Sequence, residues 1–596
     1  MKINRLFDFL TMQVQAIPDD IFLSSKVAST NSPGTWHDYS YQDTQHIVDR
    51  VSQLLIDAGL KKGDKIALIS NNRPEWNFAD LGSQQIGVIN VPMYPTISED
   101  DYAFIFQDAG IQFAFVGDTD ILAKVQPLEG RISTLKKILT FDDIAGADNF
   151  RESIDQIKTI DYQEIDKRKE AVDEADIVTI IYTSGTTGLP KGVMLTHLNI
   201  VSNLTSVSQV LPFMKNQKSL SFLPLCHSFE RTVFYAYLMF GIHIYYAESL
   251  DTIGENLREV QPYCFTTVPR VLEKVYEKIM AKGNNLTGIR RSLFFWSIQV
   301  GAAYKLGLPK SLSYRLQLAI ARKLVFSKWQ EALGGKVEFI VTGAAAMQPR
   351  LITLFTAAGI QVIEGYGLTE TSPVLTVNGI EEDKRCVGSI GMPIPGVEIR
   401  LAEDGEIVAR GPNIMKGYYN RPDLTEQVID KDGWFYTGDI GSWFDYNGHT
   451  FLKITDRKKE LFKTAGGKYI APQAIENKMK ESRYIEQIIV VGGDTRKYIG
   501  ALIVPSFPQL EAWVKENNIS AGNHTELVNN PQIISMVENE ITRYNRHFGK
   551  WEQIKKIKLL DKEWTIGGGQ LTPTLKLKRK IIEEQFATEI NTLFKD

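Results

Sequence analysis

Helical and strand patterns alternate along the chain from residue 40 onward, and this alternation restricts the fold more than any other feature. A helical pattern over residues 43–58 is followed by an apolar strand at 65–70, a helix at 73–86 and a strand at 87–91. Further strands are expected at 113–116, 138–141, 177–182, 265–268 and 337–342. The pattern predicts βαβ units and mostly parallel sheets, in which ligands bind beyond the carboxyl ends of the strands.

Composition places the chain among ordinary globular proteins. With 596 residues, 43% of them hydrophobic and 23% charged, it can form several domains with large cores. A net charge of −4 without a long run of like charge argues against a dedicated nucleic-acid binder. The three cysteines, Cys226, Cys264 and Cys386, are too far apart for a metal motif or a disulfide framework, which favours a reducing compartment.

Neither the N-terminus nor any internal segment indicates export or a membrane span. The first ten residues carry Asp8 within their apolar stretch and no small-residue cleavage site, unlike a signal peptide. The longest apolar run, residues 233–247, is shorter than the about 20 residues that a span needs, and we expect it to be a buried helix that leads into a strand at 242–246. We therefore expect a cytoplasmic protein.

Residues 182–193 form a glycine-rich loop directly after a buried strand. Their sequence is Tyr-Thr-Ser-Gly-Thr-Thr-Gly-Leu-Pro-Lys-Gly-Val, in which glycines allow a ligand to approach the backbone and hydroxyls and a lysine suit phosphate oxygens. Gly192 follows the lysine, so the loop is not of the GxxxxGK[ST] type. A flexible linker is the alternative, but a linker would not normally follow a buried strand or carry a Pro-Lys pair. The candidate phosphate-binding residues are Thr183, Ser184, Gly185, Thr186, Thr187, Gly188 and Lys191.

Four further segments contain groups that suit a nucleotide. Residues 342–346 follow a strand and have small side chains that admit a flat base. Residues 364–370 follow the next strand; Tyr366 offers a face for adenine stacking, and Glu370 offers a hard carboxylate for Mg²⁺, beside the hydroxyl of Thr369. Asp439 could accept hydrogen bonds from both ribose hydroxyls, and residues 572–579 supply cations.

Each of these segments also has a simpler explanation when taken alone. Residues 365–367 could form a plain turn, and they are not a dinucleotide fingerprint because Glu370 replaces the last glycine. Asp439 could cap a helix or turn, and the Lys-Arg tail could be a solvated face. Their joint occurrence in this order favours a nucleotide site.

The sequence resembles the adenylate-forming superfamily of acyl-CoA synthetases, luciferases and peptide-synthetase adenylation domains, from about residue 20 to residue 582. The segments at 182–193, 365–370, 436–439 and 456–463 resemble the phosphate loop, the adenine and magnesium motif, the ribose motif and the hinge of that superfamily. The resemblance implies a catalytic role for Lys576, Glu370, Thr183 and Lys459, with Thr183 and Glu370 as Mg²⁺ ligands and Lys459 as the pivot. The other implied nucleotide or cofactor contacts are Gly343, Ala344, Glu364, Gly365, Tyr366, Gly367, Thr369, Asp439, Arg457, Lys463 and Gly466.

The subclass is also indicated by motifs. Residues 223–231, 324–335 and 571–579 are similar to long-chain fatty acyl-CoA synthetases, which implies fatty acid, ATP and coenzyme A as substrates and an acyl-AMP intermediate. His227 and Arg231 are the candidate substrate residues, although a lone histidine is as often structural. The chain departs from the wider superfamily at Lys576, where Thr-Leu-Lys replaces Thr-Gly-Lys, and at Glu230-Arg231, where some members have a gating tryptophan.

We therefore predict an α/β fold with two domains. Residues 1–455 would form a large N-terminal domain with mixed, mostly parallel βα sheets and a small β-barrel-like subdomain. Residues 456–596 would form a small, mobile α+β C-terminal domain joined by a hinge. A helical insertion at 275–325, rich in Lys, Arg and aromatic residues, would cover the core or contact a membrane surface or a partner.

Several alternatives to a long-chain acyl-CoA ligase stay open. An acyl carrier protein could replace coenzyme A as the thiol acceptor, or the acyl chain could be of another length. A luciferase-like oxygenase and a nucleotide-binding regulator without turnover are also compatible with a nucleotide site, although the long-chain motifs and Lys576 argue against them. Nucleic acid is not an expected partner, and both a monomer and a homodimer, as well as a peripheral contact at the inner face of the membrane, remain open.

Overall fold

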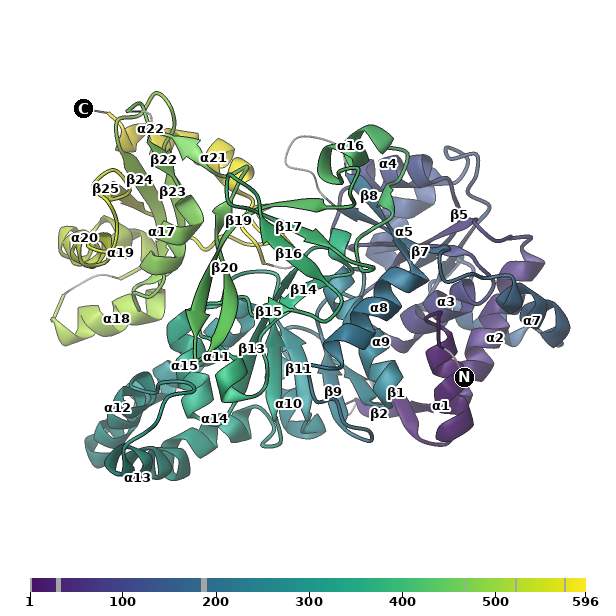
Figure 1. Ribbon diagram of the computed structural model, residues 1–596, viewed down its shortest axis with the longest axis horizontal. Coiled ribbons are helices and arrows are strands. Elements are labelled where there is room, and N and C mark those ends of the chain that lie inside the picture. The colour runs from purple at the N-terminus through teal and green to yellow at the C-terminus, as the bar shows by residue number, and fades with distance from the viewer. Residues whose placement is uncertain are drawn as a thin grey trace.

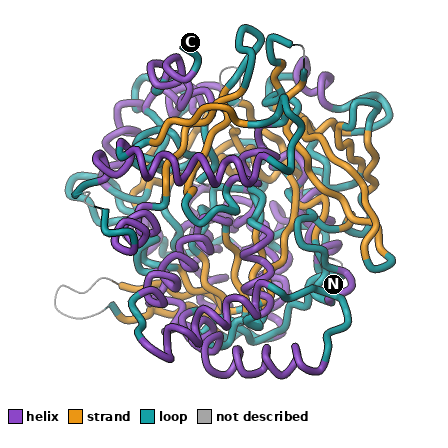
Figure 2. The backbone as a smooth tube through the Cα atoms, turned by 90° about the vertical axis from the view of Figure 1, so that its left-hand side faces the viewer, coloured by secondary structure: helices purple, strands orange, loops and turns teal. Residues whose placement is uncertain are grey.

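The computed structural model describes residues 3–27, 34–183, 190–466, 468–519, 522–572 and 575–595 (Figure 1). It contains sheets of nine, seven, four, three and two strands within these ranges. Seen from the side, helices lie against the strands throughout the molecule (Figure 2). In the described part of the chain, no helix is both long enough and apolar enough to cross a membrane.

The seven-stranded sheet has the order β18-β8-β7-β4-β3-β5-β6. Strands β7, β4, β3, β5 and β6 run parallel, whereas β8 and β18 are antiparallel to their neighbours. The strands are β3 Lys65–Ile69, β4 Ile89–Met93, β5 Ile111–Val116, β6 Lys137–Thr140, β7 Ile177–Thr183, β8 Lys191–Thr196 and β18 Gly417–Tyr418. Nearly all of β3 and β4 is buried, as expected for parallel strands that are covered on both faces.

The nine-stranded sheet has the order β15-β14-β13-β12-β11-β9-β10-β1-β2, and its six central strands, from β13 to β1, are parallel. Its strands are β1 Ile21–Val27, β2 Thr35–Ser40, β9 Lys218–Ser221, β10 His243–Tyr246, β11 Cys264–Thr267, β12 Phe339–Thr342, β13 Gln361–Gly367, β14 Val374–Val377 and β15 Met392–Pro393. The long apolar run is helix α9 (Ser228–Phe240) followed by β10, as predicted.

The subdomain expected to be barrel-like is an open antiparallel sheet of four strands. These are β16 Glu398–Leu401, β17 Glu406–Arg410, β19 Phe435–Tyr446 and β20 His449–Arg457. Strand β20 includes Asp456 and Arg457, because these residues pair with Ile440 and Asp439 of β19. The domain boundary expected after residue 455 therefore falls inside β20, which ends at Arg457.

The C-terminal part of the chain has its own hydrophobic core, formed by buried residues between Ile470 and Leu593. Its strands are β21 Phe462–Lys463, β22 Tyr469–Ile470, β23 Ile485–Val491, β24 Ile499–Pro505 and β25 Ile554–Leu559. Its helices are α17 Pro472–Met479, α18 Phe507–Glu516, α19 His524–Asn529, α20 Pro531–Asn545, α21 Arg579–Gln585 and α22 Ala587–Leu593. This unit lies at the upper left of the molecule, beside the four-stranded sheet (Figure 1).

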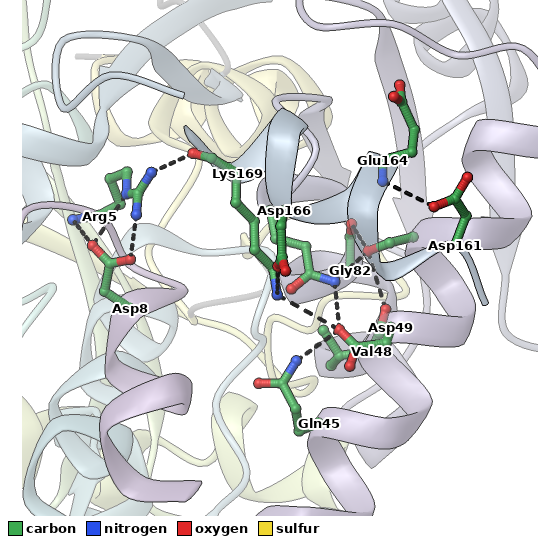
Figure 3. Close-up of polar contacts among 12 residues, drawn as sticks. Arg5, Asp8, Gln45, Val48, Asp49, Gly82, Asp161, Glu164, Asp166 and Lys169 are labelled. Carbon is green, nitrogen blue, oxygen red and sulfur yellow. Dashed lines mark hydrogen bonds and ion pairs between the residues drawn. The ribbon is translucent and has the colours of Figure 1, made fainter. Parts of the chain in front are cut away.

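The other helices lie around the two large sheets. They are α1 Asp8–Ala16, α2 Tyr41–Asp57, α3 Pro74–Gln84, α4 Glu99–Ala109, α5 Thr119–Val125, α6 Phe150–Asp155, α7 Tyr162–Glu170, α8 His197–Val207, α10 Ile253–Val260, α15 Pro349–Ala357 and α16 Pro422–Val428. At the N-terminal end, Arg5 donates to the backbone carbonyl of Lys169 on α7, and Lys169 lies 3.8 Å from Asp49 on α2 (Figure 3). These contacts connect the segment before α1 with helices α7 and α2, which are distant from it in the sequence.

The segment predicted to be a helical insertion is helical. It consists of α11 Pro269–Asn284, α12 Gly288–Ala302, α13 Leu312–Ala321, a π-helical turn at Arg322–Phe326 and α14 Ser327–Ala332. Phe294, Val300, Leu318 and Phe326 are buried and share a core with residues of α15. The inner side of the segment therefore covers the nine-stranded sheet, which agrees with the expectation that the segment covers the core.

A buried ion pair connects the two large sheets. Arg231 on α9, which follows a strand of the nine-stranded sheet, lies 2.5 Å from Asp80 on α3 of the seven-stranded sheet. Arg231 also donates to Thr179 of β7, and Tyr235 donates to Asp80. Both charged side chains are almost fully buried, at 1% and 0% exposure. Burial opposes the charge on Arg231, but Asp80 and Tyr235 hold its pKa above the ordinary value.

Replacing Asp80 by alanine should destabilise the N-terminal part by about 3–5 kcal/mol, because Arg231 would remain buried without its partner. Urea denaturation followed by tryptophan fluorescence measures this change. Glu398→Ala is the matched control, since it removes an exposed ion pair with Arg410 and should cost less than about 1 kcal/mol. A loss of stability in Asp80→Ala as small as that in the control would show that the buried pair does not hold the two sheets together.

Candidate active site

A cavity of about 1980 Å³ lies between the large sheets, the four-stranded sheet and the C-terminal unit. Most of the residues predicted for a nucleotide site line this one cavity, although they come from segments up to several hundred residues apart. They are Thr183, Lys191, His227, Gly343, Ala344, Glu364, Gly365, Tyr366, Gly367, Thr369, Glu370, Asp439, Arg457, Lys459 and Lys576.

The remaining predicted residues fall into two groups. Ser184, Gly185, Thr186, Thr187 and Gly188 lie outside the described residues. Arg231, Lys463 and Gly466 are described but do not line the cavity. The guanidinium of Arg231 is in the core with Asp80, so we no longer assign it to the substrate.

The carboxyl ends of parallel strands provide much of the cavity wall. Strand β7 ends at Thr183, β12 leads into Gly343 and β13 ends at Gly367. This is the edge at which α/β sheets bind ligands. Ala344 has a φ of 67°, so the loop after β12 turns sharply through a left-handed residue at the cavity.

Asp439 is the centre of a polar cluster on one wall. The Tyr366 hydroxyl donates to its Oδ2 at 2.7 Å, and the Arg457 Nε lies 3.5 Å from its Oδ1. Strand pairing places Arg457 opposite Asp439. Burial raises the pKa of Asp439, whereas Arg457, Tyr366 and Lys576 oppose this rise. The arrangement gives a positioned carboxylate that can accept hydrogen bonds from a ligand.

Glu370 is held on another wall by Tyr418, whose hydroxyl donates to Glu370 Oε1 at 2.9 Å. The amino group of Lys191 lies 4.6 Å from the centre of the Tyr418 ring. Burial lowers the pKa of Lys191, and the nearby charge of Lys459 adds to this effect. Glu370, Tyr418 and Lys191 therefore bring a carboxylate, a hydroxyl and an ammonium group together, with Lys191 at the start of β8.

Lys576 of the C-terminal unit also lines the cavity. Its backbone N–H donates to the hydroxyl of Thr572 at 3.0 Å, and the Thr572 N–H donates back to the Lys576 carbonyl at 2.8 Å. Burial lowers the pKa of Lys576 to about 8, with a further contribution from Arg457, while Asp439 and Glu370 act in the opposite direction. The site thus contains a buried amine that an anionic ligand would stabilise in its charged form.

The chain passes from the four-stranded sheet to the C-terminal unit at Lys459. Lys458 is tied to the sheet through Glu406 at 2.7 Å and Asp404 at 2.6 Å. Glu460, two residues on, lies 3.5 Å from Arg579 of the C-terminal unit. Lys459 is therefore the residue between two anchored neighbours.

Burial shifts the pKa of two ionisable side chains near the Gly343 loop in the direction that favours their neutral forms. His227 caps α9 by accepting from the Phe229 N–H at 3.2 Å, and burial lowers its pKa to about 3, with Lys576 adding to the effect. Glu364 accepts from the Met347 N–H at 3.1 Å, and burial raises its pKa to about 8. Neutral groups here suit an uncharged part of a ligand, such as a base.

The same cavity has an apolar wall between α8, α9 and the nine-stranded sheet. The described residues that form this wall are uncharged: Leu204, Val207, Leu211, Phe213, Val233, Ala236, Tyr237, Phe339, Val341, Val374 and Val377. Phe213 stacks on Phe240 with a centroid distance of 5.1 Å and meets the edge of Phe339 at 6.1 Å. One cavity therefore joins a charged region to a hydrophobic one.

Sequence reasoning missed Tyr418 and this apolar wall. Tyr418 is 48 residues from Glu370, and no spacing connects them. The helical periodicity of α8 and α9 could have indicated apolar faces, but not that part of those faces lines a cavity. It also missed Arg270 on α11, which pairs with Glu486 on β23 and so ties the helical segment to the C-terminal unit.

Comparison with known proteins identifies the family. The AMP-binding enzyme family model matches residues 10–419, and the model of the AMP-binding enzyme C-terminal domain matches residues 460–596. The chain therefore belongs to the AMP-binding enzyme family.

Relatives in this family match over nearly the whole chain. The chain is 32% identical to the long-chain-fatty-acid–CoA ligase FadD15 of Mycobacterium bovis, over 94% of this chain and 93% of the relative. It is 32% identical to the human long-chain-fatty-acid–CoA ligase 1, over 95% of this chain and 83% of the relative. It is 30% identical to the peroxisomal long chain acyl-CoA synthetase 6 of Arabidopsis thaliana, over 100% of this chain and 87% of the relative.

Solved structures have the same fold at lower identity. The anthranilate CoA ligase AuaEII in complex with anthranoyl-AMP has a TM-score of 0.73 at 16% identity, covering 98% of both chains. ATP-bound MatB from Rhodopseudomonas palustris has a TM-score of 0.72 at 19% identity, covering 98% of this chain and 99% of that chain. The predicted α/β architecture is confirmed.

Replacing Asp439 by asparagine should weaken AMP binding by about tenfold or more, because a charged acceptor is lost from a buried wall. Titration calorimetry with AMP measures this change. Glu398→Gln, an exposed carboxylate on the same sheet, should leave the affinity unchanged. If the Asp439→Asn variant and the unmodified chain bind AMP with equal affinity, Asp439 does not contact the nucleotide.

Proposed function

We propose that this chain is an ATP-dependent long-chain fatty acid–CoA ligase that forms an acyl-AMP intermediate. The observation that supports this most is the single cavity that joins Lys191, Glu370 and Lys576 to an apolar wall. A fatty acid needs both environments, since its chain requires a hydrophobic lining and its carboxylate must meet the nucleotide phosphate. The names of the curated relatives support the same substrate class.

In the first step, a carboxylate oxygen attacks the α-phosphorus of ATP, the bond to the β-phosphate breaks, and pyrophosphate leaves. Lys576 and Lys191 would offset the negative charge that develops on the phosphates. Asp439 would accept from the ribose hydroxyls, Arg457 would lie beside the ribose, and the loop at Gly343 and Ala344 would face the base. Phosphate contacts from Ser184, Gly185, Thr186, Thr187 and Gly188 belong to the same proposal.

The residues present fit Mg²⁺ that arrives with ATP. Thr183 and Glu370 both line the cavity, and Mg²⁺ needs only one or two protein ligands when phosphates and waters complete its shell. The described residues include no cluster of three or more His, Cys, Asp or Glu side chains that could hold a metal, which argues against a separate metal centre. Bound Mg²⁺ would neutralise phosphate charge.

In the second step, the thiol of coenzyme A attacks the acyl carbon, its proton is lost to solvent, and AMP leaves. We propose that the C-terminal unit first rotates about Lys459, which withdraws Lys576 and brings Lys463 and Gly466 to the site. In the described orientation, Lys576 is in the cavity and Lys463 and Gly466 are outside it, as this proposal requires for the first step. A peripheral membrane contact is part of the proposal, since the fatty acid partitions into lipid.

Release of pyrophosphate and AMP with a ladder of carboxylates from acetate to oleate, with and without coenzyme A, tests the function. We expect coenzyme-A-dependent turnover that is fastest with long-chain acids. Ala236→Phe should shift the preference towards shorter acids because Ala236 lines the apolar wall, whereas Ala587→Phe, an exposed residue of α22, should not.

Each other outcome of the ladder points to a different function. Fastest turnover with acetate or aromatic acids would overturn the long-chain assignment. Pyrophosphate release without any thioester would indicate another acceptor, and no release with any acid would reject the ligase.

Lys576→Ala should abolish acyl-AMP formation but leave thioester formation from supplied acyl-AMP largely intact. Because the pKa of Lys576 is lowered to about 8, kcat/KM for ATP in the first step should fall as the pH rises through about 8. Lys576→Arg should remove this alkaline limb.

The same shift has a defined effect on stability. In the unfolded chain, Lys576 keeps its proton up to the ordinary pKa of a lysine. The free-energy cost of burying the charged amine is therefore present below about pH 8 and is relieved as the pH rises above it.

Lys562→Ala, at an exposed position of the same unit, is the control for the two half-reactions of the Lys576→Ala experiment. Equal loss of the two half-reactions in Lys576→Ala would contradict the assigned role.

A further inference from the structure

Helix α13 and the π-helical turn after it carry a row of exposed aliphatic side chains, which we name the apolar ridge. It consists of Leu312, Leu316, Ile320 and Leu324, with exposed fractions of 82%, 65%, 40% and 51%. These residues are spaced by four, so they follow one side of the helix. Isolated exposed leucines are common, but a continuous row marks an interaction site.

The ridge is not explained by packing within the chain. The opposite side of the same segment is already buried, through Leu318, Ala321 and Val325. A helix at a protein surface normally has one apolar face and one polar face, and a helix that is apolar all round is normally covered on both sides. Here the second apolar side is open, because the described residues leave it exposed.

The surroundings of the ridge are strongly basic. Residues 285–330 contain eight Lys or Arg residues and no Asp or Glu, although the whole chain has a net charge of −4. Three of the eight are paired in the described structure: Arg291 with Glu516, Lys310 with Glu382 and Lys328 with Glu331. Arg290, Lys305, Arg315 and Lys323 are exposed and have no ion pair with a described residue.

Helix α13, which carries most of the ridge, lies at the edge of the molecule (Figure 1). Helices α12 and α13 form the lower left corner of the molecule in Figure 1. None of the four ridge residues lines the active-site cavity or the smaller cavity near Trp513 in the C-terminal unit. An apolar row that lies outside both of these cavities fits a soft, extended surface better than a folded partner that inserts into a pocket.

We propose that this face binds the surface of an anionic lipid bilayer. The apolar ridge would enter the boundary between headgroups and acyl chains, and Arg290, Lys305, Arg315 and Lys323 would face the phosphates of the headgroups. An interfacial helix with apolar residues on one side and cations beside them binds lipid in this way. The docking itself does not depend on the reaction; only the idea that docking brings the enzyme to its fatty acid rests on the proposed function.

Flotation of the purified chain with vesicles tests the proposal. We expect binding to phosphatidylcholine vesicles that contain about 30% phosphatidylglycerol, weaker binding to pure phosphatidylcholine, and a marked loss when NaCl is raised from about 0.05 M to about 0.5 M. The double variant Leu316→Ser/Ile320→Ser should lower partitioning by about tenfold or more, and Arg315→Glu/Lys323→Glu should do the same on anionic vesicles.

Tyr162→Ser/Lys167→Glu provides the matched control, because it removes an exposed aromatic residue and an exposed cation from α7, at the opposite side of the molecule in Figure 1. All variants should keep the thermal unfolding midpoint and the AMP affinity of the unmodified chain, which shows that they are folded. Vesicle binding that is unchanged in the ridge variants, or that falls equally in the α7 control, would overturn the proposal.

Two further results would also overturn it. The unmodified chain could fail to bind any vesicle, or the ridge could bind an acidic acyl carrier protein and show no binding to vesicles. Because flotation needs no turnover, a chain that binds vesicles through the ridge but forms no acyl-AMP would refute the proposed function and leave this inference standing.

Discussion

The buried ion pair between Asp80 and Arg231 fixes the relation between the two large sheets, and the rest of the site depends on that relation. Arg231 comes from a connection within the nine-stranded sheet, whereas Asp80 and Thr179 belong to the seven-stranded sheet. A charge in the core is tolerated only when it is paired and hydrogen-bonded. Any shift of one sheet against the other would separate these groups, so the pair favours a single arrangement of the strand ends.

A second feature of the molecule is a set of cations held in a partly desolvated cavity. Burial lowers the pKa of both Lys191 and Lys576, and neighbouring cations add to the effect at each. A polyphosphate would supply the missing negative charge and raise these pKa values again. The cavity is thus arranged for an anionic ligand before that ligand arrives, which is the arrangement that electrostatic catalysis requires.

The helical segment between Pro269 and Ala332 has three different sides. Its inner side packs on α15 and covers the nine-stranded sheet. Arg270 at its beginning pairs with Glu486 and so reaches the C-terminal unit, which must move if the second step is to occur as proposed. Its outer side carries the apolar ridge. One segment therefore stabilises the large domain, contacts the small one and presents a surface to the outside.

The sequence by itself determined the types of element and the segments that carry chemistry. Hydrophobic periodicity depends on local geometry, so α2, β3, β7 and the helical segment at 275–325 could be predicted. The glycine-rich loop, Tyr366, Glu370, Asp439 and Lys576 could be selected because their side chains suit nucleotide chemistry and their order matches a known family. The position of the domain boundary relative to β20 was misjudged, because charged residues in a sequence do not show that cross-strand partners extend the strand to Arg457.

The tertiary structure decided what no local pattern contains. It placed Arg231 in the core rather than at the substrate, because a guanidinium finds its partner in Asp80, 151 residues away. It joined Tyr418 to Glu370, turned parts of α8 and α9 into the wall of a cavity, and left the ridge on α13 uncovered. The reason is physical: burial and pairing depend on which surfaces meet in space, and these contacts connect residues that the sequence keeps far apart.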